Sequence, residues 1–278
     1  MLKLNNVHTT WVLVVITILG IVFRLIGFGV LPAGLNRDEA ALGYNAFSLL
    51  QSGKDEWGVS WPIVFRSFGD YKLAGYIYAL IPFIGVFGNT AFAVRLPSLL
   101  AGIVLIPLVY LFTKALVKRK DIAHVAAGMQ ATAPWALHYS KVGFEANVAL
   151  MLFVASLYAF IEMDVMRIQI KKWVASWGAW HALDKKNSVL IYQIFGLVCI
   201  FFSLLTYNAP LVLVPSIFLI MLVMKKYTLA IGIGVVSICA FLLVFPATKG
   251  KTGITVFTDI GVVEQQHLAY QEAGSSFI

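Results

Sequence analysis

Long runs of apolar residues, separated by short polar intervals, dominate this chain. A helix needs about 20 apolar residues to cross the hydrocarbon core of a bilayer. Runs of about that length predict about seven transmembrane helices, at residues 11–30, 92–113, 122–137, 148–164, 189–206, 210–224 and 228–246. The pattern therefore predicts an all-α, polytopic membrane protein in which residues 1–278 form a single membrane domain.

Basic residues orient these helices, because Lys and Arg accumulate in short cytoplasmic loops. They follow the second and sixth predicted helices and fill the stretch 165–188 after the fourth. We expect these stretches and the N-terminus to be cytoplasmic. The first loop (residues 31–91), the loop 138–147 and the tail from Ala247 are then extracytoplasmic.

A further apolar stretch, residues 73–87, would reverse this topology if it crossed the membrane. It is short and is interrupted by Gly75, Pro82 and Gly85. We expect it to lie along the outer interface, where the neighbouring tyrosines suit an aromatic belt. The first extracytoplasmic loop is thus predicted to contain interfacial helices.

The composition also indicates a membrane protein. Hydrophobic residues make up 60% of the chain and charged residues 12%, whereas about a quarter of the residues are charged in a typical soluble domain. The net charge of +8 does not indicate nucleic-acid binding, because the basic residues form short clusters between apolar runs and not one basic face. The expected partners are membrane lipids.

Candidate chemistry concentrates in the first outside loop. Asp38 and Glu39 directly follow the first apolar run. A carboxylate held near apolar surface suits general-base catalysis; equally, Asn36 or Asp38 could cap a short helix that runs through Tyr44. Lys72, late in the loop, suits an anionic phosphate at the bilayer surface, and snorkelling is the plain alternative.

Three more charged residues lie at the predicted outer surface. Glu145 precedes the fourth predicted helix, and Lys141, four residues earlier, is its expected ion-pair partner. A structural pair and a catalytic role are both compatible with that spacing. Arg95 begins the second predicted helix on the outer side, against the charge rule, and so predicts an anionic partner, either a lipid phosphate or a carboxylate.

The order of several short motifs resembles a known family. An apolar helix leads to Asp38-Glu39, and then follow the motifs Lys72-Leu73-Ala74-Gly75-Tyr76, Phe87-Gly88-Asn89 and Arg95-Leu96-Pro97-Ser98. This order is similar to the amino-terminal half of polyprenyl-phosphate-sugar glycosyltransferases of the C-type (GT-C) membrane fold. Within that group it resembles the protein O-mannosyltransferases and the lipid A aminoarabinose transferases (glycosyltransferase family 39). The resemblance covers about residues 23–215.

This resemblance implies an activity and a location. It implies inverting transfer of a sugar from a polyprenyl phosphate to an acceptor hydroxyl on a protein, a lipid or a wall glycan, at the outer face of a bacterial inner membrane. Relatives continue through further membrane helices and often a soluble domain, so we expect the chain to represent their amino-terminal part.

The resemblance also implies roles for individual residues. Asp38 matches the proposed base, Glu39 its acidic companion and Glu145 a second acid of the active site. Lys72 matches a lysine that holds the carrier phosphate, an assignment that rests on the aminoarabinose transferases alone, because many relatives have His-Pro-Pro at residues 70–72. Further candidate phosphate-binding residues are Arg95 and Lys141.

Two alternatives stay open at this point. Asp38 and Glu145 could present carboxylate oxygens to Mg²⁺ or Mn²⁺, or a lysine could replace the ion. A transporter or flippase for a lipid or a lipid-linked sugar would use the same charged groups without forming a bond. Transporters often show two similar halves, and the sequence shows no such repeat.

Overall fold

The computed structural model describes residues 6–67, 70–174 and 182–247, most of them helical. In chain order the elements are α1 (Asn6–Leu25), α2 (Arg37–Ser52), β1 (Val64–Ser67), β2 (Asp70–Leu73), α3 (Ala74–Phe87), α4 (Ala91–Val117), α5 (Lys120–Thr132), α6 (Pro134–Lys141), α7 (Glu145–Val174), α8 (Ala182–Thr206), α9 (Ala209–Val223) and α10 (Tyr227–Ala247). Beyond Ala247, the predicted extracytoplasmic tail is not among the described residues.

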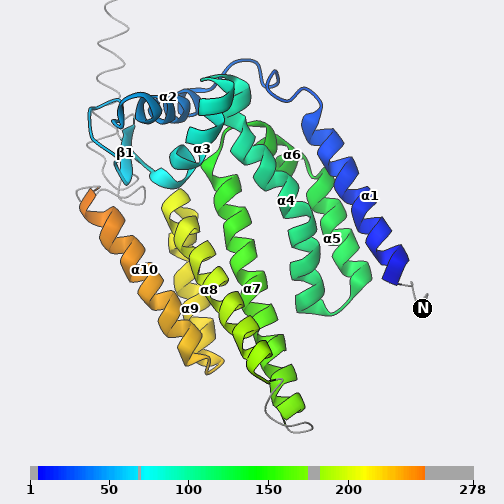
Figure 1. The fold of residues 1–278 in the computed structure, drawn as a ribbon. Helices are drawn as coiled ribbons and strands as arrows, with labels where there is room; N and C mark the ends of the chain where they lie inside the picture. The colour runs from blue at the N-terminus through cyan, green and yellow to red at the C-terminus, as the bar shows by residue number, and fades with distance from the viewer. Residues whose placement is uncertain (1–5, 68–69, 175–181, 248–278) are drawn as a thin grey trace, which may run out of the picture.

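The long helices form a bundle. Figure 1 shows them running along a common direction, with α2, α3 and the β1–β2 hairpin gathered at one end, here called the loop end. Within the bundle α1 packs on α4 and α5, α4 on α7, α7 on α8, and α8 on α10. The loop predicted for residues 31–91 is therefore a folded cap on one end of the bundle.

Four stretches of the described residues are long and apolar enough to cross a bilayer. They are Ala91–Val117, Glu145–Met163, Val189–Thr206 and Tyr227–Phe245. Shorter apolar helices are Thr10–Leu25, Ala74–Phe87 and Ala209–Val223. The architecture is that of an all-α membrane protein, as the sequence predicts.

The prediction of one continuous membrane helix over residues 122–137 is wrong. Helix α5 ends at Thr132, Ala133 takes an extended conformation (φ −59°, ψ 130°), and α6 begins at Pro134. Proline disfavours a helical conformation in the residue before it and cannot donate a backbone hydrogen bond. The chain therefore starts a new, short helix that continues into the predicted loop 138–147.

The stretch 165–188, predicted as a cytoplasmic loop, also contains helix. Helix α7 continues to Val174, and α8 begins at Ala182. Residues 175–181 lie outside the described part of the chain.

The cap is fixed to the bundle by an apolar cluster. Leu42 and Leu49 of α2 pack with Phe65 of β1 and with Ile77 and Leu80 of α3, all buried. Helix α3 in turn packs on α4 and α8. This core holds the start of α2 and the end of the hairpin against the upper turns of the bundle.

Local sequence explains the start of α2. The Asn36 side chain accepts a hydrogen bond from the Glu39 backbone N–H, and the Glu39 side chain accepts one from the Asn36 backbone N–H. This reciprocal pair is a capping box. The short helix predicted after the first apolar run is confirmed, and Asn36 caps it while Asp38 lies in its first turn.

Candidate active site

A lysine between two carboxylates lies at the loop end. Lys72 Nζ is 3.1 Å from Asp38 Oδ1 and 3.6 Å from Glu145 Oε1. Asp38 comes from α2, Lys72 from β2 and Glu145 from α7. Three residues far apart in sequence therefore form one ionic cluster, which we call the Asp38 cluster.

Secondary structure places each member of the Asp38 cluster. Asp38 lies in the first turn of α2, and Glu145 is the first residue of α7. Lys72 pairs with the buried Phe65 across the antiparallel hairpin, one residue before the buried Leu73 leads into α3. Asp38 and Glu145 thus each lie at a helix N-terminus, where the helix dipole favours negative charge, and both carboxylates contact the Lys72 ammonium group.

A polar pocket surrounds this cluster. Its volume is about 200 Å³, and its other lining residues are Tyr71, Leu73, Phe144, Thr206, Tyr207 and Asn208. The Asp38 side chain is 45% exposed, that of Lys72 17% and that of Glu145 8%. Asp38 is thus the most accessible member for a ligand, while Glu145 is the buried member and contacts the same lysine.

An apolar cavity adjoins the polar pocket. It measures about 570 Å³ and lies between α3, α7, α8 and α10, lined by residues such as Gly75, Val148, Leu152, Phe201 and Leu243. Thr206 lines both spaces. The site therefore offers a charged compartment and a lipid-like compartment side by side.

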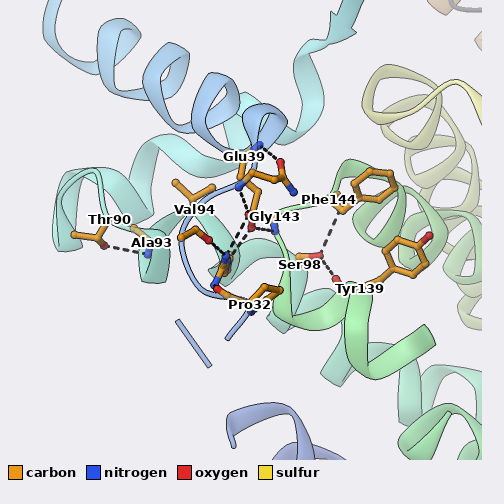
Figure 2. Close-up of polar contacts among 12 residues, drawn as sticks. Pro32, Glu39, Thr90, Ala93, Val94, Ser98, Tyr139, Gly143 and Phe144 are labelled. Atoms are coloured by element: carbon orange, nitrogen blue, oxygen red, sulfur yellow. Dashed lines mark hydrogen bonds and ion pairs between the residues drawn. The ribbon is translucent and has the colours of Figure 1, made fainter. Parts of the chain in front are cut away.

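Glu39 and Arg95 lie in a separate, buried network that we call the Glu39–Arg95 network. Arg95 Nε lies 2.8 Å from Glu39 Oε1, and Arg95 Nη2 lies 3.2 Å from Oε2. The guanidinium also donates to the backbone oxygens of Pro32 (3.0 Å) and Gly34 (2.6 Å). Figure 2 shows Glu39 at the centre of this network, with Pro32 below it and Gly143 beside it.

The contacts of Glu39 determine its charge. Burial alone would raise the pKa of this carboxyl, but hydrogen bonds from Arg95 and from the backbone N–H groups of Gly143 and Asn36 bring the pKa below its ordinary value. Arg95 and Glu39 are both fully buried. The Glu39 carboxylate is ionised, and both side chains have several partners within the protein, so the geometry of the pair suits fixing α2 to α4 and not binding a substrate.

Lys141 does not pair with Glu145, contrary to the sequence-based expectation. Its Nζ donates to the backbone oxygen of Ile26 at 2.8 Å, while Glu145 pairs with Lys72. Val142, between the two residues, has an extended backbone (φ −114°, ψ 150°). Residues 141 and 145 therefore belong to different helices and do not face each other as neighbours on one helix would.

The residues proposed as metal ligands already share a cation. Asp38 and Glu145, the suggested ligands of Mg²⁺ or Mn²⁺, both contact the ammonium group of Lys72. Among residues 6–67, 70–174 and 182–247, no group of three or more His, Cys, Asp or Glu side chains could hold a metal ion. The arrangement does not fit a divalent ion, because Lys72 already supplies positive charge at that position.

Sequence reasoning missed two features. Arg24 is fully buried and donates to Ser140 Oγ and to the backbone oxygens of Gln130 and Ala131 in the last turn of α5. The sequence signal that could have identified Arg24 is a single arginine within an apolar run. Phe144, which lines the pocket, was also missed, although it directly precedes Glu145.

No protein-family model matches the chain, and a search of curated proteins finds none that matches.

Proposed function

We propose that this chain is an inverting glycosyltransferase that moves a sugar from a polyprenyl-phosphate donor to an acceptor hydroxyl at the outer face of a bacterial inner membrane. One observation carries the proposal: Lys72 lies between Asp38 and Glu145 in a polar pocket that adjoins an apolar cavity at one end of a membrane-helix bundle. A lipid-linked phosphate has the same two-part chemistry.

The donor would bind across the two compartments. Its phosphate would lie in the polar pocket, where Lys72 offers positive charge and the dipoles of α2 and α7, whose N-termini lie there, favour an anion. Part of its isoprenoid chain would fill the apolar cavity, whose volume of about 570 Å³ is in the range of ordinary ligand pockets. Thr206 marks the junction between head group and chain.

Asp38 would act as the general base. As the acceptor oxygen forms its bond to the anomeric carbon, Asp38 takes the hydroxyl proton, and the bond between that carbon and the phosphate oxygen breaks. The phosphate leaves with both bonding electrons, and Lys72 neutralises the charge that develops on it. A single displacement inverts the anomeric centre without a covalent sugar intermediate.

Lys72 would couple donor binding to base activation. In the structure its ammonium pairs with Asp38 at 3.1 Å, and an arriving phosphate competes for the same group. Moving Lys72 toward the phosphate releases the Asp38 carboxylate for the acceptor proton. Glu145 then keeps the lysine within reach from the opposite side.

The distribution of basic residues supports the proposed orientation. Lys114, Lys118 and Arg119 lie at the turn from α4 to α5, at the opposite end of α4 from Arg95. By the positive-inside rule these charges favour a cytoplasmic turn and therefore an extracytoplasmic Asp38 cluster. We include in the proposal the seven-span topology, with α1, the α5–α6 pair and α9 as the shorter crossings.

The test is single-turnover transfer from radiolabelled polyprenyl-phosphate sugars in membranes that contain the chain. Asp38→Asn keeps the shape of the side chain but removes the base, so transfer should fall by roughly 10²- to 10⁴-fold. Asp121→Asn is the matched control, because Asp121 also pairs with a cationic side chain, Arg119, but lies exposed at the other end of the bundle. Its transfer should equal that of the unmodified chain.

Two results would overturn the proposal. Full transfer by Asp38→Asn would remove Asp38 from the role of base. Movement of the intact donor across the membrane, with no glycosylated product from any donor in the set, would replace the transferase with the transporter.

A further inference from the structure

Three aromatic rings form a row beside the Asp38 cluster. The ring centroids of Tyr139 and Phe144 are 5.2 Å apart with 30° between the ring planes, and those of Phe144 and Tyr207 are 6.0 Å apart with 54° between planes. The row joins α6, the residue before α7 and the residue after α8. We call Tyr207, Phe144 and Tyr139 the aromatic row.

The aromatic row leads from the reacting groups to the surface. Phe144 and Tyr207 line the polar pocket together with Asp38 and Lys72, whereas Tyr139 at the other end is 41% exposed. Figure 2 shows the rings of Tyr139 and Phe144 projecting to the same side, away from Glu39. A ligand in the pocket can therefore extend along the row without leaving contact with aromatic surface.

Buried polar groups fix the backbone of two adjacent members of the row, Tyr139 and Phe144. Ser98 Oγ, on α4, donates to the backbone oxygen of Tyr139 at 2.7 Å and is 3.5 Å from that of Phe144. Asn147 donates from its backbone N–H to the Phe144 oxygen and from its side chain to the Ser98 oxygen. The backbone that carries these two rings is therefore held before any ligand arrives, which lowers the entropic cost of binding.

The chemistry of the row suits a sugar ring. An aromatic face is electron-rich, and the C–H face of a pyranose is its weakly positive, apolar complement. The Tyr207 and Tyr139 hydroxyls and the Asn208 side chain offer hydrogen-bond partners for the hydroxyl groups at the rim of the sugar. A hydrocarbon chain would leave these polar groups without hydrogen-bond partners. The apolar cavity, which Thr206 also lines, suits a hydrocarbon chain better.

We propose that the aromatic row is a pyranose-binding subsite that holds a sugar ring of the substrate next to the Asp38 cluster. The inference rests on the proposed transferase function and deepens it, because it names the residues that bind a sugar ring of the substrate. The ring belongs either to the lipid-linked donor or to an acceptor glycan, and the two sources share the same stacking chemistry.

The test measures binding and does not require transfer. Saturation-transfer NMR and titration in detergent would use two sets of probes: tetrasaccharides of glucose, mannose and N-acetylglucosamine, and short-chain prenyl-phosphate forms of the same sugars. Tyr139→Ala should weaken binding of the recognised probe by about 2- to 10-fold, as expected for the loss of one aromatic stacking contact. Tyr139→Phe retains the ring face and should restore most of the affinity.

Trp135→Ala is the matched control. Trp135 is another exposed aromatic residue of the short helix α6, 64% accessible, but it is not part of the row. Its removal should leave sugar binding unchanged. Equal losses from Trp135→Ala and Tyr139→Ala, no loss from Tyr139→Ala, or no binding of any probe would overturn the proposal.

A second variant identifies the source of the sugar. If the ring is that of the donor, Lys72→Gln should weaken binding of the prenyl-phosphate probes, because the phosphate and the sugar bind together. If it is that of the acceptor, the free tetrasaccharides should bind equally well to Lys72→Gln and to the unmodified chain. Asp38→Asn should bind sugar normally in both cases. Sugar binding by the unmodified chain, with no transfer by that chain from any donor, would reject the transferase and keep the subsite.

Discussion

Asp38 and Glu39 are neighbours in sequence, but each belongs to a different ionic cluster. Glu39 is fully buried, pairs with the fully buried Arg95 and receives further hydrogen bonds from two backbone N–H groups. Asp38 is nearly half exposed and contacts Lys72 at the edge of a pocket. The same chemical group is therefore closed to ligands at one position and open to them at the next.

This difference separates a structural pair from a candidate catalyst. The Glu39–Arg95 network satisfies its charges within the protein and ties α2 to α4, which holds the first turn of α2 in place. The Asp38 cluster depends on that placement but keeps a route to the pocket. The two clusters should thus respond to mutation in opposite ways: one should lose stability and the other should lose activity.

Removing the buried acid should have the largest effect. Glu39→Ala leaves the Arg95 guanidinium buried without its counter-charge, and breaking a buried pair in this way costs roughly 3–5 kcal/mol. The unfolding temperature in detergent should fall sharply. Asp38→Ala, one residue away, breaks a partly exposed pair worth about 0–1 kcal/mol, and its unfolding temperature should change little. Equal shifts in the two variants would contradict the distinction between the clusters.

Replacing the two cations should show the opposite contrast. Lys72→Gln removes the charge proposed to neutralise the leaving phosphate, and transfer should fall by roughly 10²- to 10³-fold. The loss of stability should be smaller than in Arg95→Gln, because Lys72 and Asp38 are partly exposed whereas Arg95 and Glu39 are both fully buried. Arg95→Gln should instead reduce the amount of folded protein, because it leaves Glu39 buried and unpaired. Parallel transfer assays and thermal unfolding would distinguish these outcomes, and a Lys72→Gln variant that transfers normally would reject the phosphate-binding role.

Part of this arrangement could be predicted from sequence. Apolar runs identified the long helices, and Asn36 followed by Glu39 three residues later carried the capping signal at the start of α2. Both are local patterns, in which nearby residues decide the structure. The division of labour between Asp38 and Glu39 was not predictable, because it depends on Arg95, 56 positions away.

The failed pairing of Lys141 with Glu145 has the same cause. The spacing of four residues favours a pair only within one continuous helix. The extended Val142 ends α6, and α7 starts afresh at Glu145. Glu145 then pairs with Lys72, which the hairpin brings from the distant cap, and a sequence without tertiary contacts does not show that approach.

A smaller effect is expected where the cap touches α8. A Cβ atom at Gly75 would lie 2.9 Å from Thr206 Cα and 3.0 Å from the Leu205 oxygen, whereas at Gly85 on the same helix it would meet only Leu50 Cδ2 at 3.7 Å. Gly75→Ala should therefore destabilise the protein by about 1–3 kcal/mol through overpacking. It should also lower transfer, since Thr206 lines both compartments of the site.

Gly85→Ala is the matched control for that change. Alanine stabilises a helix by roughly 0.5–1 kcal/mol relative to glycine when space allows, so this variant should unfold at the same or a slightly higher temperature. Thermal unfolding of both variants checks the contrast. Similar behaviour of the two alanine variants would mean that the close approach of α3 to α8 is not required.

The smallest expected effect concerns pH and isolates Glu39 from the other acids. Its pKa is lower in the folded protein than its ordinary value, so the unfolded chain binds the proton more readily. The stabilisation from this carboxylate is complete above the unfolded pKa of about 4.3 and is lost as the pH falls through the lower, folded pKa.

The Glu39→Gln variant lacks this acid-dependent contribution to stability. The difference in unfolding temperature between the unmodified chain and Glu39→Gln should therefore stay constant from pH 7 to about pH 5 and narrow in more acidic solution. A difference that widens with acid would mean that the bonds from Arg95 and the backbone do not outweigh the burial of Glu39.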